Sequence, residues 1–403
     1  MNQSFSSLHT IKHCRKSEFD DFEILQEELS SELENVYNEI IEEKFEFDLL
    51  KTSKFYLTKK LTDILILRKL NDNIKRLYKE EQSNRRLIIT QVKNLLEETC
   101  PFWVIKTDIK SFYESIERNR IVEKLQNDSM LSYHSVLLLN KVFDNKELIG
   151  STGVPRGMNI SSTLSEIYMR KFDKWISRSK SVYYFARFVD DIIIFSNSLN
   201  DALELIKNLN PKLNELAEGL TINKSKTELF DGNTLKRLNV NNGKYIGCVK
   251  NLEYLGYKFT KTKIDKSTYE LKISIASKKV KKIKTRIVLA LLDFSKNKDF
   301  ELLEKRIKFL TGNYSIKKSF KGDDLRAGIY YNYMQVNDLS VFDELNNFYR
   351  KALFSKSDKF GNKINLTKNQ KVALTKYCFK TGFQLKIYNP FTSLTMKQVI
   401  RCW

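Results

Sequence analysis

An apolar segment interrupted by two adjacent aspartates, residues 183–196 (YYFARFVDDIIIFS), constrains the fold more than any other part of the sequence. Two apolar runs flanking a short polar pair are typical of two strands joined by a turn. An ordinary hairpin turn accommodates Asp190 and Asp191 without any functional role. However, the apolar neighbours place at least one carboxylate against a hydrophobic sheet, where an unpaired charge is costly. The segment therefore predicts a hairpin with a cation close to these aspartates.

A third aspartate follows another apolar run. Residues 103–109 (WVIKTDI) have the composition of a strand, and a helix is expected from Tyr113 onward. Asp108 at the end of this strand is either the N-cap of that helix or a functional group. Carboxylates that converge from different strands suit Mg²⁺, which takes oxygen ligands, keeps some waters and binds substrate phosphates. Two such ions can activate a 3′-hydroxyl and stabilise a leaving pyrophosphate.

The segment GVPRGMNISSTLSEIYM lies between these aspartates in the sequence. Gly153, Pro155 and Gly157 predict a tight turn that leads into a helix. The helix then presents small side chains, against which a flat base pair can lie: Ser161, Ser162 and Ser165. The alternative is an ordinary loop followed by a capped helix, because such a turn alone is a weak signal.

The remaining hydrophobic periodicity predicts strands interleaved with helices, followed by a helical tail. Apolar residues recur at helical spacing over residues 19–41, 160–177 and 200–218, and residues 254–259 (YLGYKF) read as a short strand. From Ser277 to about residue 380 the chain is Lys-rich and helical in pattern. The predicted fold class is α+β followed by an all-α region.

The net charge of +21 is unevenly distributed. Residues 17–48 hold 13 acidic residues against one basic residue, Lys44, whereas residues 49–403 hold 36 acidic and 66 basic residues. A basic field of this strength favours a polyanionic partner such as nucleic acid, although a Lys-rich proteome gives the same composition.

The five cysteines are scattered and the chain has three histidines, which argues against a structural zinc site. No stretch approaches about 18 uncharged apolar residues, and no export signal is apparent at the N-terminus. A protein of the reducing cytoplasm, without a membrane span, is expected.

Five segments, taken in order, resemble the palm motifs of reverse transcriptases that are commonly lettered A to E: KTDIKSFYESI, GVPRGMNISSTLSEIYM, FVDDIIIFS, LTINKSKTELF and LEYLGYKF. The resemblance extends from Leu65 to Phe259, and the shared order is far more specific than any single segment. It implies a right-hand polymerase fold. We therefore expect an acidic helical extension over residues 1–50, fingers and palm with an antiparallel sheet over 51–260, and a basic helical thumb and C-terminal region over 261–403.

The resemblance also implies a metal site. Asp108 and Asp190 take the positions of the direct ligands of two Mg²⁺ ions, for which Mn²⁺ is the expected substitute. Asp191 completes the acidic pair, and the Ile109 carbonyl is an additional candidate ligand. Phe188 occupies the aromatic position of the Y-x-D-D box, which here reads FVDD.

Further positions match residues that contact the nucleotide. Tyr113 takes the place of the bulky side chain that clashes with a ribose 2′-hydroxyl and so selects dNTPs; a plain core aromatic is the alternative. Arg156, followed by Gly157, stands where retroviral enzymes carry Gln. Lys226 matches the lysine that protonates the leaving pyrophosphate, with Lys224 as its rival.

In the fingers, arginines are the candidates to bind the triphosphate, because guanidinium pairs with phosphate through two hydrogen bonds: Arg76, Arg85 and Arg86. This part of the chain departs from the P-x-x-G-x-x-R pattern of many relatives, and a solvated surface charge is the alternative for each arginine. Leu255, Gly256 and Tyr257 resemble the primer grip. Basic residues interleaved with aromatics in the last third suit a thumb that tracks a heteroduplex.

The resemblance implies an RNA-directed DNA polymerase that adds dNTPs to a 3′ end, with an RNA template and a DNA product. The segments look most like the bacterial defence-associated reverse transcriptases of the unclassified and abortive-infection groups, with type 3 systems as the nearest. That likeness implies a noncoding RNA template, an antiviral role, and either a homo-oligomer or a complex with a second defence protein. The alternatives are a template-independent or protein-primed DNA polymerase, a non-catalytic RNA-binding scaffold, and an RNA-dependent RNA polymerase.

Overall fold

The computed structural model describes residues 3–53, 55–247, 250–265, 269–318, 324–357 and 360–403. These residues form two compact units, each described by itself. Unit 1 comprises Met1–Ile88, Cys100–Gly232 and Arg237–Gly247, and unit 2 comprises Ile89–Thr99, Asn233–Lys236 and Cys248–Trp403. Cys248 lies outside the described residues.

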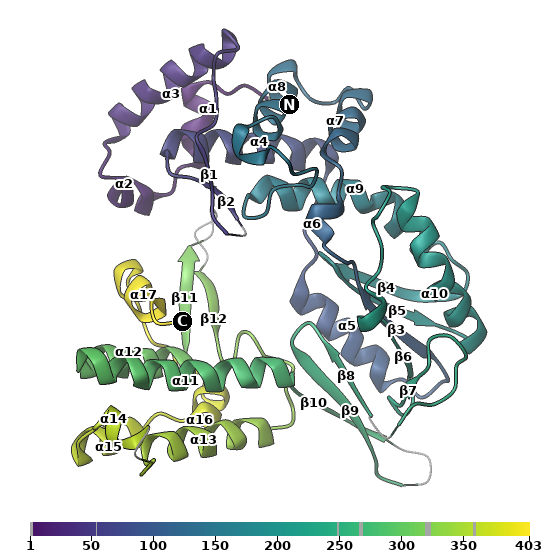
Figure 1. The fold of residues 1–403 in the computed structure, drawn as a ribbon, viewed down its shortest axis with the longest axis vertical. Helices are drawn as coiled ribbons and strands as arrows, with labels where there is room; N and C mark the ends of the chain where they lie inside the picture. The colour runs from purple at the N-terminus through teal and green to yellow at the C-terminus, as the bar shows by residue number, and fades with distance from the viewer. Residues whose placement is uncertain (1–2, 54, 248–249, 266–268, 319–323, 358–359) are drawn as a thin grey trace. The chain divides into compact units, whose positions relative to one another are not determined.

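Unit 1 is built on a five-stranded antiparallel sheet of order β4-β5-β3-β6-β7 (Figure 1). Its strands are β3 (Trp103–Asp108), β4 (Val182–Phe188), β5 (Asp191–Ser196), β6 (Glu228–Asp231) and β7 (Arg237–Leu238). The predicted hairpin over residues 183–196 is confirmed as β4 and β5, and the predicted strand after residue 102 is confirmed as β3. Residues 192–195 of β5 are fully buried, so both faces of this central strand are covered and no alternation of polar residues is seen.

Two helices pack on this sheet. Helix α9 (Asn159–Ser177) contacts β4, and α10 (Leu199–Asn214) contacts β3 and β5. Both match the helical periodicity of the sequence, and α10 begins with a capping bond in which the Ser198 hydroxyl accepts from the backbone N–H of Asp201, at 3.1 Å. Helix α4 (Leu61–Tyr78) in turn packs against α9 (Figure 1). This arrangement makes α9 the link between the sheet and the rest of unit 1.

The remaining helical segments of unit 1 surround α4 or connect the strands: α1 (Ser7–Thr10), η1 (Ile11–His13), α2 (Lys16–Phe22), α3 (Gln26–Ile41), α6 (Phe112–Ser115), α7 (Arg118–Asn127), α8 (Tyr133–Phe143), η2 (Lys146–Leu148) and η3 (Lys224–Lys226). A small hairpin pairs β1 (Leu49–Lys51) with β2 (Tyr56–Thr58). Helix α5 (Arg85–Glu97) begins in unit 1 and continues into unit 2. The prediction of one helix over residues 19–41 was wrong, because the chain breaks after α2 at Glu23, whose φ is +52°.

Unit 2 contains a three-stranded antiparallel sheet and helices. The sheet has the order β10-β9-β8, from β8 (Asn251–Tyr254), β9 (Tyr257–Lys263) and β10 (Tyr269–Ile275). The prediction of a single strand over residues 254–259 was wrong, because Leu255 and Gly256 both have positive φ and form the turn between β8 and β9. The helices are α11 (Ser277–Asn297), α12 (Phe300–Thr311), α13 (Ser340–Leu353), α14 (Gly361–Ile364), α15 (Lys368–Thr375), α16 (Phe379–Gln384) and α17 (Ser393–Ile400).

A hairpin of β11 (Asn313–Lys318) and β12 (Asp324–Gly328) interrupts the helical tail that the sequence predicts. The side chain of Asn313 is fully buried and donates to the carbonyls of Gly382 and Ile387, at 3.2 and 3.1 Å. This anchoring holds the start of β11 away from helical geometry directly after α12. In the described ranges, no helix combines the length and apolar composition that crossing a bilayer requires.

The sheet of unit 1 carries an aromatic cluster around Phe195. Its ring lies 5.7 Å from that of Phe102, 5.9 Å from Tyr183 and 5.6 Å from Tyr184. Phe195→Ala should lower the free energy of unfolding by about 3–5 kcal/mol, because it leaves a cavity in a closely packed cluster. Chemical denaturation followed by circular dichroism measures this, with Ile149→Ala, a 79% exposed residue, as the control. Equal losses in the two variants would contradict the packing described.

Candidate active site

The register of the sheet brings the three predicted aspartates together at one end. Asp108, the last residue of β3, is the direct cross-strand partner of Asp191, the first residue of β5. Asp190 lies in the turn between β4 and β5, where its carbonyl accepts a hydrogen bond from the backbone N–H of Ile109, at 3.0 Å. Asp108 is not the cap of the following helix, since the N-cap of α6 is Ser111.

Asp108 is buried and only partly satisfied. Lys226, in η3, donates to its Oδ2 at 2.7 Å, whereas Oδ1 is buried and has no hydrogen-bond partner among the described residues. The bond to Asp108 raises the pKa of the Lys226 ammonium, and the charges of Asp190 and Asp191 add to this effect. Of the two candidate lysines, Lys226 is therefore the one that pairs with Asp108, although the burial class of both residues is exposed.

Two of the three carboxylates are costly to ionise at this site. Burial raises the pKa of Asp191 to about 6, and the negative charges of Asp190 and Asp108 contribute. Burial also raises the pKa of Asp190, again with a contribution from Asp108. These are the responses of acids that are desolvated and close to one another.

The donor set fits a hard divalent cation that takes part of its shell from a substrate. In the part of the chain that the structure describes, no group of three or more His, Cys, Asp or Glu side chains is arranged to hold a metal alone. Magnesium is commonly bound by one or two carboxylates together with waters and substrate phosphates. Such a cation would give Asp108 Oδ1 a partner and would reduce the cost of ionising Asp191.

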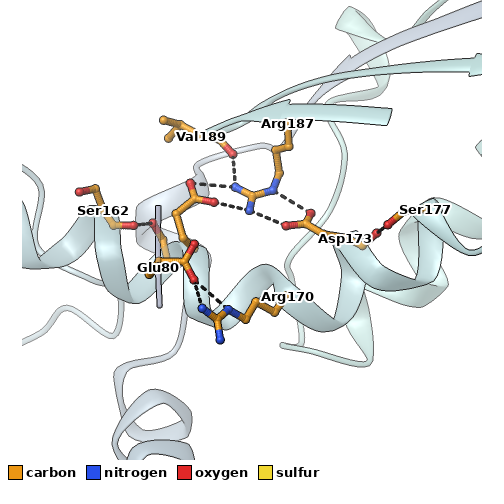
Figure 2. A network of polar contacts seen from close by, with 9 residues as sticks. Glu80, Ser162, Arg170, Asp173, Ser177, Arg187 and Val189 are labelled. Atoms are coloured by element: carbon orange, nitrogen blue, oxygen red, sulfur yellow. Dashed lines mark hydrogen bonds and ion pairs between the residues drawn. The ribbon is translucent and has the colours of Figure 1, made fainter. Parts of the chain in front are cut away.

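The turn between β4 and β5 has an unusual backbone. Val189 adopts φ +61°, a left-handed conformation that is unfavourable for a β-branched residue. Its carbonyl accepts a hydrogen bond from Arg187 Nη1, at 2.9 Å. Figure 2 shows that the Arg187 guanidinium also faces Asp173, and ion pairs join it to both Asp173 and Glu166 of α9.

Sequence reasoning missed Arg187, Glu166 and Asp173. The available signal was a single charged residue inside the apolar run YYFARFV, since a buried arginine requires a partner. The partners themselves lie 14 and 21 residues away along the chain, on a helix.

The glycine-rich turn before α9 packs directly on Tyr113 and Glu114. The backbone N–H of Val154 donates to the Tyr113 carbonyl at 2.8 Å, and a Cβ on Gly153 would lie 2.4 Å from the Glu114 Cα. Arg156 makes two hydrogen bonds to Glu114, from Nε at 2.5 Å and from Nη2 at 2.8 Å. Its guanidinium carbon also lies 5.5 Å from the centre of the Tyr113 ring. This turn therefore holds Tyr113, the residue predicted to select dNTPs.

The other side of the same turn meets the β1–β2 hairpin. The backbone N–H of Tyr56 donates to the Arg156 carbonyl at 2.8 Å. Gly157 has φ +97°, and a Cβ there would lie 3.0 Å from the Tyr56 carbonyl oxygen. Glycine is therefore required at this position by both backbone conformation and close approach.

Tyr113 lies close to the acidic residues. Burial raises the pKa of its phenol, and the charges of Glu166 and Asp190 contribute to the rise. A hydrogen bond with Ser165 opposes that shift and links Tyr113 to the small-residue face of α9.

The remaining predicted positions lie on α4, on α5 and at the β8–β9 turn. Arg76 forms an ion pair with Asp72 on its own helix, at 3.0 Å. Arg85 and Arg86 stand at the first turn of α5, and Arg86 is exposed. The predicted primer grip belongs to unit 2: Leu255 and Gly256 form the β8–β9 turn, and Tyr257 is buried with its hydroxyl donating to the Asn332 carbonyl at 3.1 Å.

Residues 21–259 match the family model described as reverse transcriptase (RNA-dependent DNA polymerase). This confirms the expected fold class, an α+β polymerase domain with antiparallel sheets. No curated protein matches the sequence significantly.

Solved structures of telomerases show a weak likeness. Apo telomerase from Candida tropicalis truncated from the C-terminal domain is 14% identical, with 66% of this chain and 50% of that chain covered and a TM-score of 0.37. Telomerase from Candida albicans with a TWJ fragment of telomeric RNA is also 14% identical, with 96% and 57% covered and a TM-score of 0.37. Apo telomerase from C. tropicalis is 13% identical, with 96% and 63% covered and a TM-score of 0.37. The chain thus spans between 50% and 63% of these telomerase chains.

The raised pKa of Asp191 predicts a pH-dependent stability effect. A folded-state pKa of about 6, above the ordinary value near 3.9, means that ionising Asp191 destabilises the fold as pH rises through 6. In metal-free buffer, Asp191→Asn should therefore increase the free energy of unfolding by about 1–3 kcal/mol at pH 8 and leave it nearly unchanged at pH 4. Denaturation at the two pH values measures this, with the exposed Asp144→Asn as the control. A gain that is independent of pH would contradict the electrostatic explanation.

Proposed function

The chain belongs to the reverse transcriptase family, and on that premise we propose that it is an RNA-directed DNA polymerase with Asp108, Asp190 and Asp191 at its centre. The observation that carries this proposal is the sheet register, which pairs Asp108 with Asp191, together with the buried Asp108 Oδ1, which has no hydrogen-bond partner among the described residues. Carboxylates in this state need a cation, and nucleotide addition needs cations at the reacting phosphate.

Two Mg²⁺ ions, or Mn²⁺ as substitute, are the proposed cofactors. The three aspartates would hold them together with the Ile109 carbonyl. When bound, such ions activate the 3′-hydroxyl and stabilise the charge on the leaving pyrophosphate. The protein itself holds the carboxylates in place. Strand pairing fixes Asp108 and Asp191, and the Ile109 N–H fixes the Asp190 carbonyl.

Lys226 is the proposed proton donor to the leaving pyrophosphate. A lysine ammonium is protonated at neutral pH, and the bond to Asp108 raises the pKa of Lys226 further and holds it at the site. A group that must deliver a proton is best placed within hydrogen-bond reach of the departing oxygen.

Tyr113 and Gly157 are proposed to contact the incoming dNTP, with Tyr113 excluding a ribose 2′-hydroxyl. Arg156 is proposed to act through Tyr113, because the structure engages its guanidinium with Glu114 and the Tyr113 ring. The triphosphate-binding role of fingers arginines and the primer-grip role of the β8–β9 turn remain proposals that rest on resemblance: Arg76, Arg85, Arg86, Leu255, Gly256 and Tyr257.

The proposed template is an RNA, in keeping with the basic excess of residues 49–403 and with the family. The finer proposal, a noncoding RNA copied in bacterial antiviral defence, is supported by the likeness of the five motif segments to defence-associated reverse transcriptases. Sequencing the RNA and DNA that copurify with the protein distinguishes templated copying from template-independent or protein-primed synthesis.

Replacing Asp190 and Asp191 together by Ala should abolish dNTP incorporation, because both acids of the turn are lost. RNA binding should be retained and the thermal unfolding midpoint should not fall, because the variant removes two carboxylates that are costly to ionise. A host that carries this variant should lose any protection against phage. Primer extension on an RNA template measures the activity, with Asp144→Ala as the matched control. Incorporation by the double variant at the unsubstituted rate would refute the assignment of the site.

Tyr113 should determine sugar selectivity. Tyr113→Ala is expected to raise the efficiency of rNTP relative to dNTP incorporation by at least about tenfold, equivalent to ~1.4 kcal/mol, because it removes the ring that meets the 2′-hydroxyl. Tyr113→Phe keeps the ring and serves as the control that should retain discrimination. The ratio of kcat/KM for the two nucleotides is the measurement, and unchanged selectivity in Tyr113→Ala would contradict the steric role.

A further inference from the structure

Arg187 is buried at the end of β4 with its donors engaged. Nε and Nη2 donate to the two carboxylate oxygens of Asp173, at 2.9 and 2.7 Å. Nη1 and Nη2 donate to the two oxygens of Glu166, at 3.2 and 2.5 Å. The second donor of Nη1 reaches the Val189 carbonyl at 2.9 Å. The side chain is 3% exposed, so these contacts form away from solvent, where each is strong.

The carbonyl that Arg187 holds belongs to a strained residue. A left-handed conformation is unfavourable for an L-residue, and branching at the Val189 Cβ makes it more so. Such a conformation persists only when its surroundings impose it. Val189 directly precedes Asp190, so relaxation of its backbone would displace both aspartates that follow.

The anchor of Arg187 is a single rigid element. Glu166 and Asp173 lie seven residues apart on α9, and this spacing places them on one face of the helix, two turns apart. Because the guanidinium group pairs with both carboxylates, its plane has one fixed orientation. A single ion pair would not fix that orientation. The Asp190 carbonyl is held independently by the Ile109 N–H from β3.

We propose that Arg187 is a positioning residue, which sets the placement of Asp190 and Asp191 by clamping the Val189 carbonyl to α9. The proposal rests on the proposed function insofar as those aspartates hold the metal ions. Groups that orient metal ligands typically change metal affinity by about 10–100-fold when they are replaced. The competing explanation is a buried ion network that stabilises the fold and has no effect on the turn.

The chain provides a matched control in Arg170, which Figure 2 shows on the same helix. Arg170 Nε donates to Glu80 Oε2 at 2.8 Å, and its Nη2 donates to the Tyr78 carbonyl at 2.5 Å. It therefore shares the chemistry of Arg187, a guanidinium held by a carboxylate and a backbone carbonyl. Its carbonyl, however, belongs to the end of α4 and not to the β4–β5 turn.

The test compares Arg187→Lys with Arg170→Lys, since lysine keeps the charge but has no fork to span two carboxylates and a carbonyl. Arg187→Lys should raise the Mg²⁺ concentration for half-maximal dNTP incorporation by about tenfold or more, and accelerate hydrogen–deuterium exchange in residues 188–192. Arg170→Lys should change the Mg²⁺ requirement by less than about twofold and leave exchange in this turn unchanged.

A second substitution separates positioning from simple stabilisation. Glycine adopts positive φ without the cost that valine bears, so Val189→Gly reduces the dependence of the turn on the clamp. The double variant with Arg187→Lys and Val189→Gly should therefore need less Mg²⁺ than Arg187→Lys alone. Its unfolding midpoint should stay low, because the ion network is still broken.

Equal effects of the two lysine variants, or loss of stability in Arg187→Lys without any change in Mg²⁺ requirement, would overturn the proposal. If Arg187→Lys does not fold, Asp173→Asn removes one anchor and leaves Glu166, and the same two measurements decide. If the unsubstituted protein incorporates no nucleotide, the proposed function fails. Hydrogen–deuterium exchange in residues 188–192 would in that case still show whether Arg187 holds the β4–β5 turn.

Discussion

Three carboxylates at the end of one buried sheet are the constraint on which the rest of unit 1 depends. Strand pairing fixes Asp108 opposite Asp191, and the β4–β5 turn adds Asp190. Burial makes their charges expensive, as the pKa of Asp191 near 6 indicates. Lys226 forms an ion pair with Asp108. A bound cation would offset the cost of ionising these buried carboxylates.

Helix α9 and the turn before it contact both parts of the proposed site, Tyr113 and the β4–β5 turn. The turn that precedes it holds Tyr113 through Val154 and, with Arg156, through Glu114. The middle of the helix holds the aspartate turn through Arg187. Tyr113 and the candidate metal ligands are therefore both held by contacts to α9 or to the turn directly before it. Second contacts of this kind are what hold a reactive constellation to its required geometry.

The sequence was sufficient where local pattern and tertiary environment agree. The apolar runs of β3, β4 and β5 and the periodicity of α9 and α10 predicted the elements that carry the aspartates, because these are buried and strongly periodic. It was insufficient where a long-range contact decides. The break at Glu23 and the hairpin that begins at Asn313 both override a helical pattern. The Arg187 network joins residues far apart in the chain, and the partner of Arg156, Glu114, lies 42 residues away.

The most direct measurement of the central claim is anomalous scattering from Mn²⁺ in crystals of the protein with an RNA template, a DNA primer and a non-hydrolysable dNTP. We expect two peaks, with Asp108 and Asp190 oxygens among the ligands of both and the nucleotide phosphates completing their shells. Ordered nucleotide with no Mn²⁺ at these aspartates, or Mn²⁺ bound only elsewhere, would contradict it.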